Sequence, residues 1–162
     1  MGDMHRRWYA FLGAACTLVV AGVAAGIVLF SSGTSQAAPT KSQYFARVAA
    51  ICRIYGPKLD KIPPPIDVSI PSEIWESAEK VLPILRAEAD AVRRLVPPTE
   101  LREKLTRWIK LNDQSLAKLA ATLPAAREKN FQAVQTNYVA FIIRGAKAQR
   151  LGHEIGFPSP PC

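Results

Sequence analysis

The sequence changes character at residue 31, where an unbroken apolar segment gives way to a longer stretch with apolar side chains at helical spacing. Trp8 to Phe30 forms 23 residues without a charged side chain. About 20 apolar residues, at a rise of 1.5 Å each, cross a hydrocarbon core of about 30 Å. We therefore predict one transmembrane helix over residues 8–30, preceded by a short segment, residues 1–7.

Basic residues flank this apolar segment on one side only. His5, Arg6 and Arg7 precede it, whereas the first cation after it is Lys41. The positive-inside rule then places the N-terminus in the cytoplasm and the rest of the chain outside. We expect a single-pass protein of the cell membrane, with Gly22 and Gly26 as a GxxxG pair that could pack the helix against another.

A cleaved signal peptide is the alternative reading of the same segment. Ser35-Gln36-Ala37, followed by Ala38-Pro39, has the small-residue spacing that signal peptidase accepts. The apolar run is much longer than the roughly 7 to 15 residues of a signal core, which favours a retained anchor. Residues 31–39 are rich in Ser, Gly, Thr and Ala and are predicted to form a flexible tether.

Four amphipathic helices are predicted within the domain, residues 40–162. Thr40 and Gln43 form a capping box before the first. The expected inner faces are Phe45, Val48, Cys52, Tyr55, Leu59; Ile74, Ala78, Leu82, Leu85, Ala89, Val92, Val96; Leu101, Leu105, Trp108, Leu116, Leu119; and Phe131, Val134, Tyr138, Phe141, Ile142, Gly145. No segment has strand spacing. The fold class is therefore all-α, with an up-down four-helix bundle after the membrane helix.

Proline, glycine and asparagine set the expected helix boundaries. Gly56-Pro57 should kink or end the first helix, and Pro71 should lie in the first turn of the second. The third helix should end between Thr122 and Asn130, with a turn starting at Pro124 and Asn130 capping the fourth helix. Gly152 is the expected C-cap of that last helix.

The chain contains three cysteines, of which Cys16 lies in the predicted membrane helix. Cys52 and Cys162 remain as a pair in an oxidising compartment, so a disulfide is the simple inference. It would close a loop of about 110 residues and stabilise the fold by about 4 to 5 kcal/mol. Two free thiols are the alternative.

No pattern of residues indicates catalysis, a metal site or a cofactor. His153 is the one histidine outside the membrane segment and N-terminus, and next to Glu154 it is most simply an exposed helix end. A zinc site needs three or four converging ligands, and HExxH, CxxCH and GxSxG motifs are missing. We therefore expect a protein that is not an enzyme.

The net charge of +8 is carried mainly by the predicted external part. All but two of the 21 Lys and Arg, and all but one of the 13 Asp and Glu, follow residue 31. Outside the cytoplasm, nucleic acid is not the natural partner of such a charge. Anionic lipid head groups or an acidic envelope polymer fit better.

Asn130 to Ile143 is a run of fourteen residues without charge in an otherwise charged domain. At 100° per residue, its back face carries neutral polar and β-branched residues: Gln132, Thr136, Val139 and Ile143. Because interface cores are depleted in charge, we expect these four to form a partner-docking surface. The alternative is a helix buried on both sides by its own bundle.

Several short motifs resemble those of small actinobacterial, including mycobacterial, membrane-anchored envelope proteins of mostly unassigned function. They are Ala50-Ile51-Cys52, Leu95-Val96-Pro97-Pro98 with Trp108 ten residues later, and the tail from Leu151-Gly152 to Cys162. Lys129-Asn130 replaces an expected Gly-Asp, and the Pro-rich tail is longer. The resemblance implies a disulfide-stapled helical bundle outside the membrane rather than a particular function.

Together these features favour a non-enzymatic accessory or scaffolding subunit of a larger membrane complex, in transport or respiration. Its expected partner is an integral membrane protein complex. The competing hypothesis is an extracytoplasmic binding module that holds lipid or another apolar or anionic ligand between its helices.

Overall fold

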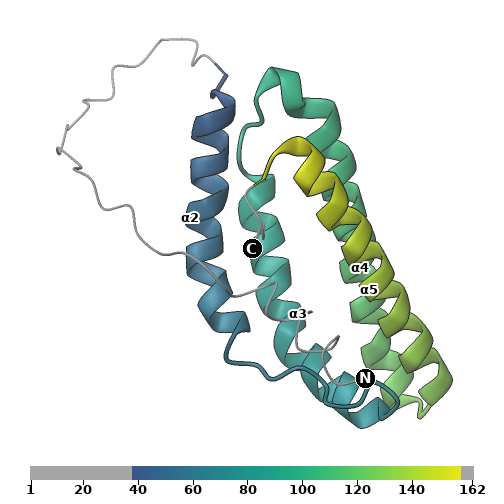
Figure 1. Cartoon of the computed structure of the whole chain (residues 1–162). Helices are drawn as coiled ribbons and strands as arrows, with labels where there is room; N and C mark the ends of the chain where they lie inside the picture. The colour runs from purple at the N-terminus through teal and green to yellow at the C-terminus, as the bar shows by residue number, and fades with distance from the viewer. Residues whose placement is uncertain (1–37, 158–162) are drawn as a thin grey trace.

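The computed structural model describes residues 38–157, and every regular element in that range is helical (Figure 1). The four α-helices are α2 (Lys41–Leu59), α3 (Pro71–Arg93), α4 (Arg102–Arg127) and α5 (Phe131–Ile155), with a short 3-10 helix, η1 (Thr99–Leu101), before α4. Within this range, none of the helices combines the length and apolar character needed to cross a membrane. The predicted span 8–30, with Gly22 and Gly26, lies outside the described residues.

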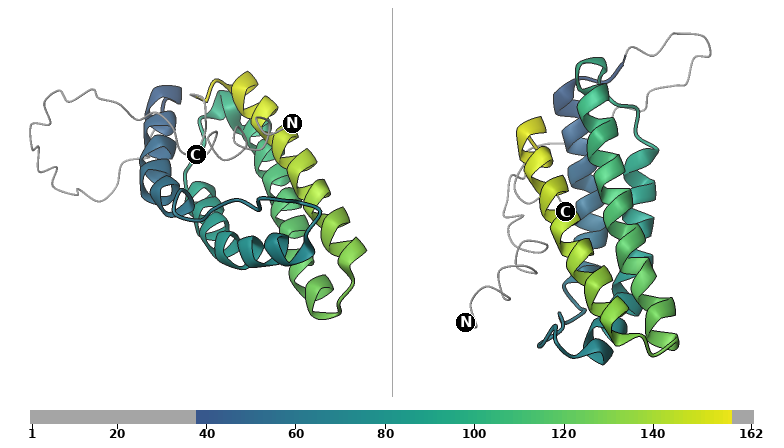
Figure 2. Two further views of the ribbon diagram at one scale, coloured as in Figure 1. Left: turned by 60° about the horizontal axis from the view of Figure 1, so that its bottom comes forward. Right: turned by 90° about the vertical axis from the view of Figure 1, so that its right-hand side faces the viewer.

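The helices run alternately up and down, and consecutive helices are neighbours (Figures 1 and 2). The most extensive packing is between α4 and α5, whereas α3 lies against α2, α4 and α5. The upper end of the bundle, as drawn in Figure 1, carries the starts of α2 and α4 and the ends of α3 and α5. The lower end carries the loop 60–70 and the turn between α4 and α5. This arrangement confirms the predicted all-α helical bundle.

Two separate side-chain clusters form the core of the bundle. The lower cluster draws on all four helices and includes Leu59, Ile74, Val81, Leu82, Leu119, Val134 and Tyr138. The upper cluster includes Tyr44, Val48, Leu101, Leu105, Leu151, Ile155 and Phe157. Between them, at mid-height, the buried positions include the polar residues Glu88 and Ser115.

Two of the predicted helix starts are confirmed. Thr40 caps α2, where its hydroxyl accepts a hydrogen bond from the Gln43 N–H and the Thr40 N–H donates to the Gln43 side chain. The Asn130 side chain accepts from the Ala133 N–H at the start of α5. Each cap satisfies a backbone donor that the helix itself leaves unpaired.

Of the predicted helix ends, the one between Thr122 and Asn130 is confirmed, because α4 ends at Arg127, and the one at Gly152 is wrong. Pro57 and Pro124 do not end their helices. α2 runs through Pro57 to Leu59, and α4 runs through Pro124 to Arg127. A proline in the last turns removes few backbone hydrogen bonds, while continuation of the helix buries Leu59 in the lower cluster. Gly152 is a buried residue inside α5, which ends at Ile155, and the C-cap is Gly156 with φ +96°.

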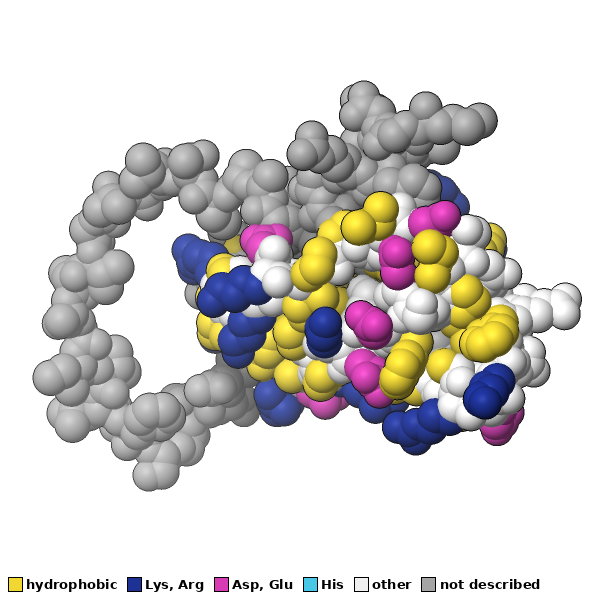
Figure 3. All heavy atoms as spheres, turned by 90° about the horizontal axis from the view of Figure 1, so that it is seen from below, with side chains coloured by type: hydrophobic (Ala, Val, Ile, Leu, Met, Phe, Trp, Pro, Cys, Tyr) yellow, Lys and Arg dark blue, Asp and Glu magenta, His cyan; other side chains and the backbone are white. Residues whose placement is uncertain are grey.

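The predicted inner faces also need correction, at Tyr44, Phe131 and Val96 among other positions. Tyr44, absent from the expected stripe, is 1% exposed and among the most buried large side chains. Two residues predicted to face inward are exposed: Phe131 is the first residue of α5, and Val96 lies in the loop after α3, where the helical period no longer sets the direction of a side chain. Figure 3 shows the lower end, where apolar side chains are interspersed with charges of both signs.

Gly145 in α5 and Gly156, the C-cap that follows α5, should respond oppositely to replacement by alanine. Gly156→Ala forces a side chain into a left-handed conformation and should destabilise the fold by about 1 kcal/mol. At Gly145 the added Cβ would lie 3.5 Å from Ser115 Oγ, an ordinary contact, so Gly145→Ala should stabilise by up to about 1 kcal/mol through helix propensity. Urea unfolding followed by circular dichroism measures both, and equal shifts of the same sign would contradict this account.

Candidate protein-docking face on α5

The inner face of α5 is fixed by both core clusters. Val134 and Tyr138 lie in the lower cluster, and Leu151 and Ile155 lie in the upper one. These residues are all buried, so rotation of α5 about its axis would expose apolar area in both clusters at once. The direction of the opposite face is therefore set by the core.

A polar contact at mid-height holds α5 close to α4. The Ser115 hydroxyl donates a hydrogen bond of 2.8 Å to the Phe141 carbonyl of α5, and Gly145 faces Ser115 one turn later. A hydroxyl bonded to a helix carbonyl satisfies the buried oxygen of Ser115, which is 3% exposed. The small side chains at this crossing allow the two helices to approach closely.

The four predicted docking residues all lie on the outer face of α5 and are exposed. Val139 is 49% exposed and Ile143 is 52% exposed, and Gln132 and Thr136 continue the same stripe at steps of three and four residues. The alternative, in which α5 is buried on both sides by its own bundle, is thus wrong within residues 38–157. We call these four residues the α5 outer face.

The charge on α5 is confined to its upper half. No Lys, Arg, Asp or Glu occurs from Phe131 to Ile143, and the exposed stripe becomes basic only at Lys147 and Arg150. A patch with β-branched apolar side chains at its centre and polar groups at its border has the composition of a protein interface.

Glu88 is a buried carboxyl group that the sequence analysis missed. It lies on α3 and is 8% exposed, and its Oε1 atom has no hydrogen-bond partner among the described residues. Desolvation by burial raises the pKa of Glu88 from its ordinary value of 4.5 to about 7. The signal was present in the sequence, because Glu88 follows Val81 by seven residues and precedes Val92 by four, which places it on the inner face of α3.

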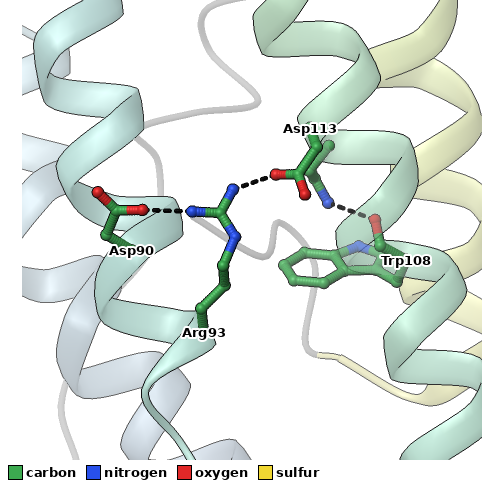
Figure 4. Close-up of polar contacts among 5 residues, drawn as sticks. Asp90, Arg93, Trp108 and Asp113 are labelled. Carbon is green, nitrogen blue, oxygen red and sulfur yellow. Dashed lines mark hydrogen bonds and ion pairs between the residues drawn. The ribbon is translucent and has the colours of Figure 1, made fainter.

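A charged network connects α3 to α4 at the surface (Figure 4). Arg93 bridges Asp90, on its own helix, and Asp113 on α4. Nearby, the Asn112 side chain donates a hydrogen bond of 3.0 Å to the Trp108 carbonyl. All three charged groups are about half exposed, and exposed pairs of this kind contribute about 0 to 1 kcal/mol.

Cys52 is half-buried on α2 beside the upper cluster and is disulfide-bonded. Cys16 and Cys162 both lie outside the described residues. The predicted pairing of Cys52 with Cys162 therefore stays a prediction.

The remaining candidate functional residues lie apart from one another. His153 is exposed in the last turn of α5, and Trp75 and Trp108 are half-buried at the core rim. Among residues 38–157, no three His, Cys, Asp or Glu side chains converge in a way that could hold a metal ion. The chain matches no known protein family, no curated protein and no solved structure. The resemblance to actinobacterial envelope proteins therefore also stays a prediction.

The buried carboxyl predicts an unusual pH dependence of stability. Because the pKa of Glu88 is higher in the folded state, the folded protein binds the carboxyl proton more tightly than the unfolded chain does. The free energy of unfolding should therefore fall as the pH rises from about 4.5 to about 7. Glu88→Gln removes the cost of burying the charge. At pH 8 it should stabilise the protein by up to about 3 kcal/mol, with little change at pH 4.

Urea unfolding of the detergent-solubilised chain at both pH values measures this difference. Glu79→Gln, an exposed position on the same helix, is the matched control and should change stability little at either pH. A Glu88→Gln variant that destabilises the protein equally at pH 4 and pH 8 would contradict a buried, unpaired carboxylate.

Proposed function

We propose that this protein is a non-enzymatic accessory subunit of a larger membrane complex, anchored by residues 8–30. The helical domain lies outside the cytoplasm and binds an integral membrane partner, of the transport or respiratory class, through the α5 outer face. A disulfide between Cys52 and Cys162 joins the C-terminal tail to α2.

The exposure of the α5 outer face supports this proposal most directly. Single exposed apolar side chains are common on soluble proteins and need no explanation. Here Val139 and Ile143 are adjacent on one face, both about half exposed, and lie within the longest uncharged run of the domain. A solvated helix face would ordinarily carry Lys, Glu or Arg at such positions.

The α5 outer face is also well placed to bind without rearrangement of the fold. Its backbone is held by the core on the opposite side of the same helix and by the Ser115 hydrogen bond. A rigid face loses little conformational entropy on association, so more of its contact energy appears as affinity.

The competing role, a carrier of lipid or another anionic ligand, has less support. The ligand would lie between the helices, where the two clusters already fill the inner faces of the helices with their own side chains. The unpaired carboxyl of Glu88 also lies at mid-height, and a buried carboxylate repels an anionic ligand.

Replacing the apolar centre of the α5 outer face with charge should abolish docking and spare the fold. Val139→Lys with Ile143→Lys would place two unpaired charges in a desolvated interface, which should weaken binding by several kcal/mol. Affinity purification of the tagged full chain from detergent-solubilised membranes should recover a stoichiometric partner with the unchanged chain and lose it with the double variant.

The matched control is Ile54→Lys with Ile66→Lys, two equally exposed or more exposed isoleucines on α2 and in the lower loop. This control adds the same charge and should retain the partner. Thermal melting should be similar for all three chains. A Val139/Ile143 variant that folds and still retains the partner would remove the α5 outer face from consideration, and bound lipid in place of a protein would favour the carrier.

A further inference from the structure

We propose that the upper end of the bundle is a binding surface for anionic lipid head groups, with Val96 as the apolar residue that contacts the bilayer interface. The proposal rests on the membrane anchor of the proposed function but not on the α5 outer face. It assigns a role to the loop between α3 and η1 and fixes which end of the bundle faces the membrane.

Charge is distributed unevenly along the bundle axis. The upper third, residues 38–48, 89–108 and 146–157, contains nine Lys and Arg and four Asp and Glu. The lower third, residues 56–82 and 118–140, contains six of each. Most of the excess of positive charge therefore lies at one end of the molecule.

The cations of the upper end are largely not neutralised by neighbouring carboxylates. Arg93 is the one member of this set with an ion pair among the described residues. Arg94, Arg102 and Lys104 are exposed, and none has a carboxylate within salt-bridge distance in that range. A group of free cations of this kind attracts an anionic surface at about 1 kcal/mol per residue near the head groups.

The loop that joins α3 to η1 carries an exposed apolar side chain between two of these cations in the sequence. Val96 is 59% exposed and lies between Arg94, the C-cap of α3, and Arg102, the first residue of α4. Pro97 and Pro98 follow it and restrict the backbone, so the side chain is presented without a large entropic cost. An apolar residue flanked by cations is the composition that favours the membrane interface.

The connection to the predicted anchor starts at this same end. The tether, residues 31–39, spans at most about 30 Å even when extended, and it enters α2 at Thr40. α2 is 19 residues long, so the lower end lies about 28 Å farther away, beyond the Debye length of about 8 Å at physiological salt. Only the upper end can therefore contribute its charge to membrane attraction when the bundle stands upright.

The same charges argue against a second copy of this chain as the partner that covers the upper end. Two upper ends brought together would oppose nine cations with nine, and like charges across an interface are unfavourable. A bilayer containing anionic lipid is the partner that complements both the charge and the position of this surface.

Hydrogen–deuterium exchange of the full chain in lipid nanodiscs tests the proposal. The Val96 N–H has no hydrogen-bond partner among the described residues, so it should exchange rapidly unless the loop is covered. Exchange in residues 94–102 should be slower in discs of phosphatidylcholine with phosphatidylglycerol than in phosphatidylcholine alone. The loop 60–70 at the lower end should exchange equally in both.

Arg94→Gln with Arg102→Gln should remove the slowing, since loss of two cations lowers the docked population about 30-fold at roughly 1 kcal/mol each. Arg127→Gln with Lys129→Gln, at the lower end, removes the same charge and should retain it. Val139→Lys with Ile143→Lys should also retain it, which separates this surface from the α5 outer face.

Several results would overturn the proposal. Equal exchange of residues 94–102 in the two kinds of disc, or slowing that survives Arg94→Gln with Arg102→Gln, would exclude head-group binding by these cations. Slowing that requires an added membrane protein rather than lipid would assign the surface to an acidic protein. A mature chain that begins at Ala38 by intact mass and does not enter discs would refute the anchor together with this proposal, whereas partner loss alone would refute only the docking face.

Discussion

The packing of α5 against α4 is the constraint on which the rest of the molecule depends. Ser115 and Gly145 bring the two helices together at mid-height, and the clusters above and below bury the same side of α5. A helix whose one side is fixed at three heights must expose the other. The uncharged residues on that other side are consequently a fixed, exposed surface rather than a by-product of loose packing.

The two proposed surfaces lie on different parts of this scaffold and have different chemistry. The upper end is basic and carries one exposed valine, while the α5 outer face is neutral and runs along the side of the bundle. If the upper end lies on the head groups, the α5 outer face points sideways, parallel to the membrane. A neighbouring membrane protein with an external domain would meet it there. Lipid binding would set the orientation of the bundle, and α5 would provide specificity.

The buried layer between the clusters contains a carboxyl group, that of Glu88. Glu88 leaves a carboxyl oxygen unpaired among the described residues, and its raised pKa means that the charged form is costly in the folded state. An apolar residue would stabilise the bundle more at neutral pH.

The presence of the helices and the residues at which they begin could be predicted from the sequence, because local signals determine both. The capping side chains of Thr40 and Asn130, Pro71 at a first turn and the 3.6-residue period all act within one turn of chain. Helix ends were less predictable. Pro57, Pro124 and Gly152 are local stop signals that burial of later residues such as Leu59 and Ile155 overrides.

The exposure of side chains near helix ends was also not predictable from the sequence. Val96 lies in the loop three residues after α3, and Phe131 is the first residue of α5. The helical period alone does not show where a helix begins or ends. The α5 outer face could be predicted because charge, not only period, marks it. Its partner leaves no trace in the sequence.

Site-specific photocrosslinking in intact membranes tests the central claim most directly. A benzophenone amino acid at position 143, on the α5 outer face, should crosslink the full chain to one discrete protein. The same group at position 54, equally exposed on α2, should give no such product. Crosslinks from position 143 to lipid or to many proteins at random, or an identical discrete product from position 54, would contradict a specific docking face on α5.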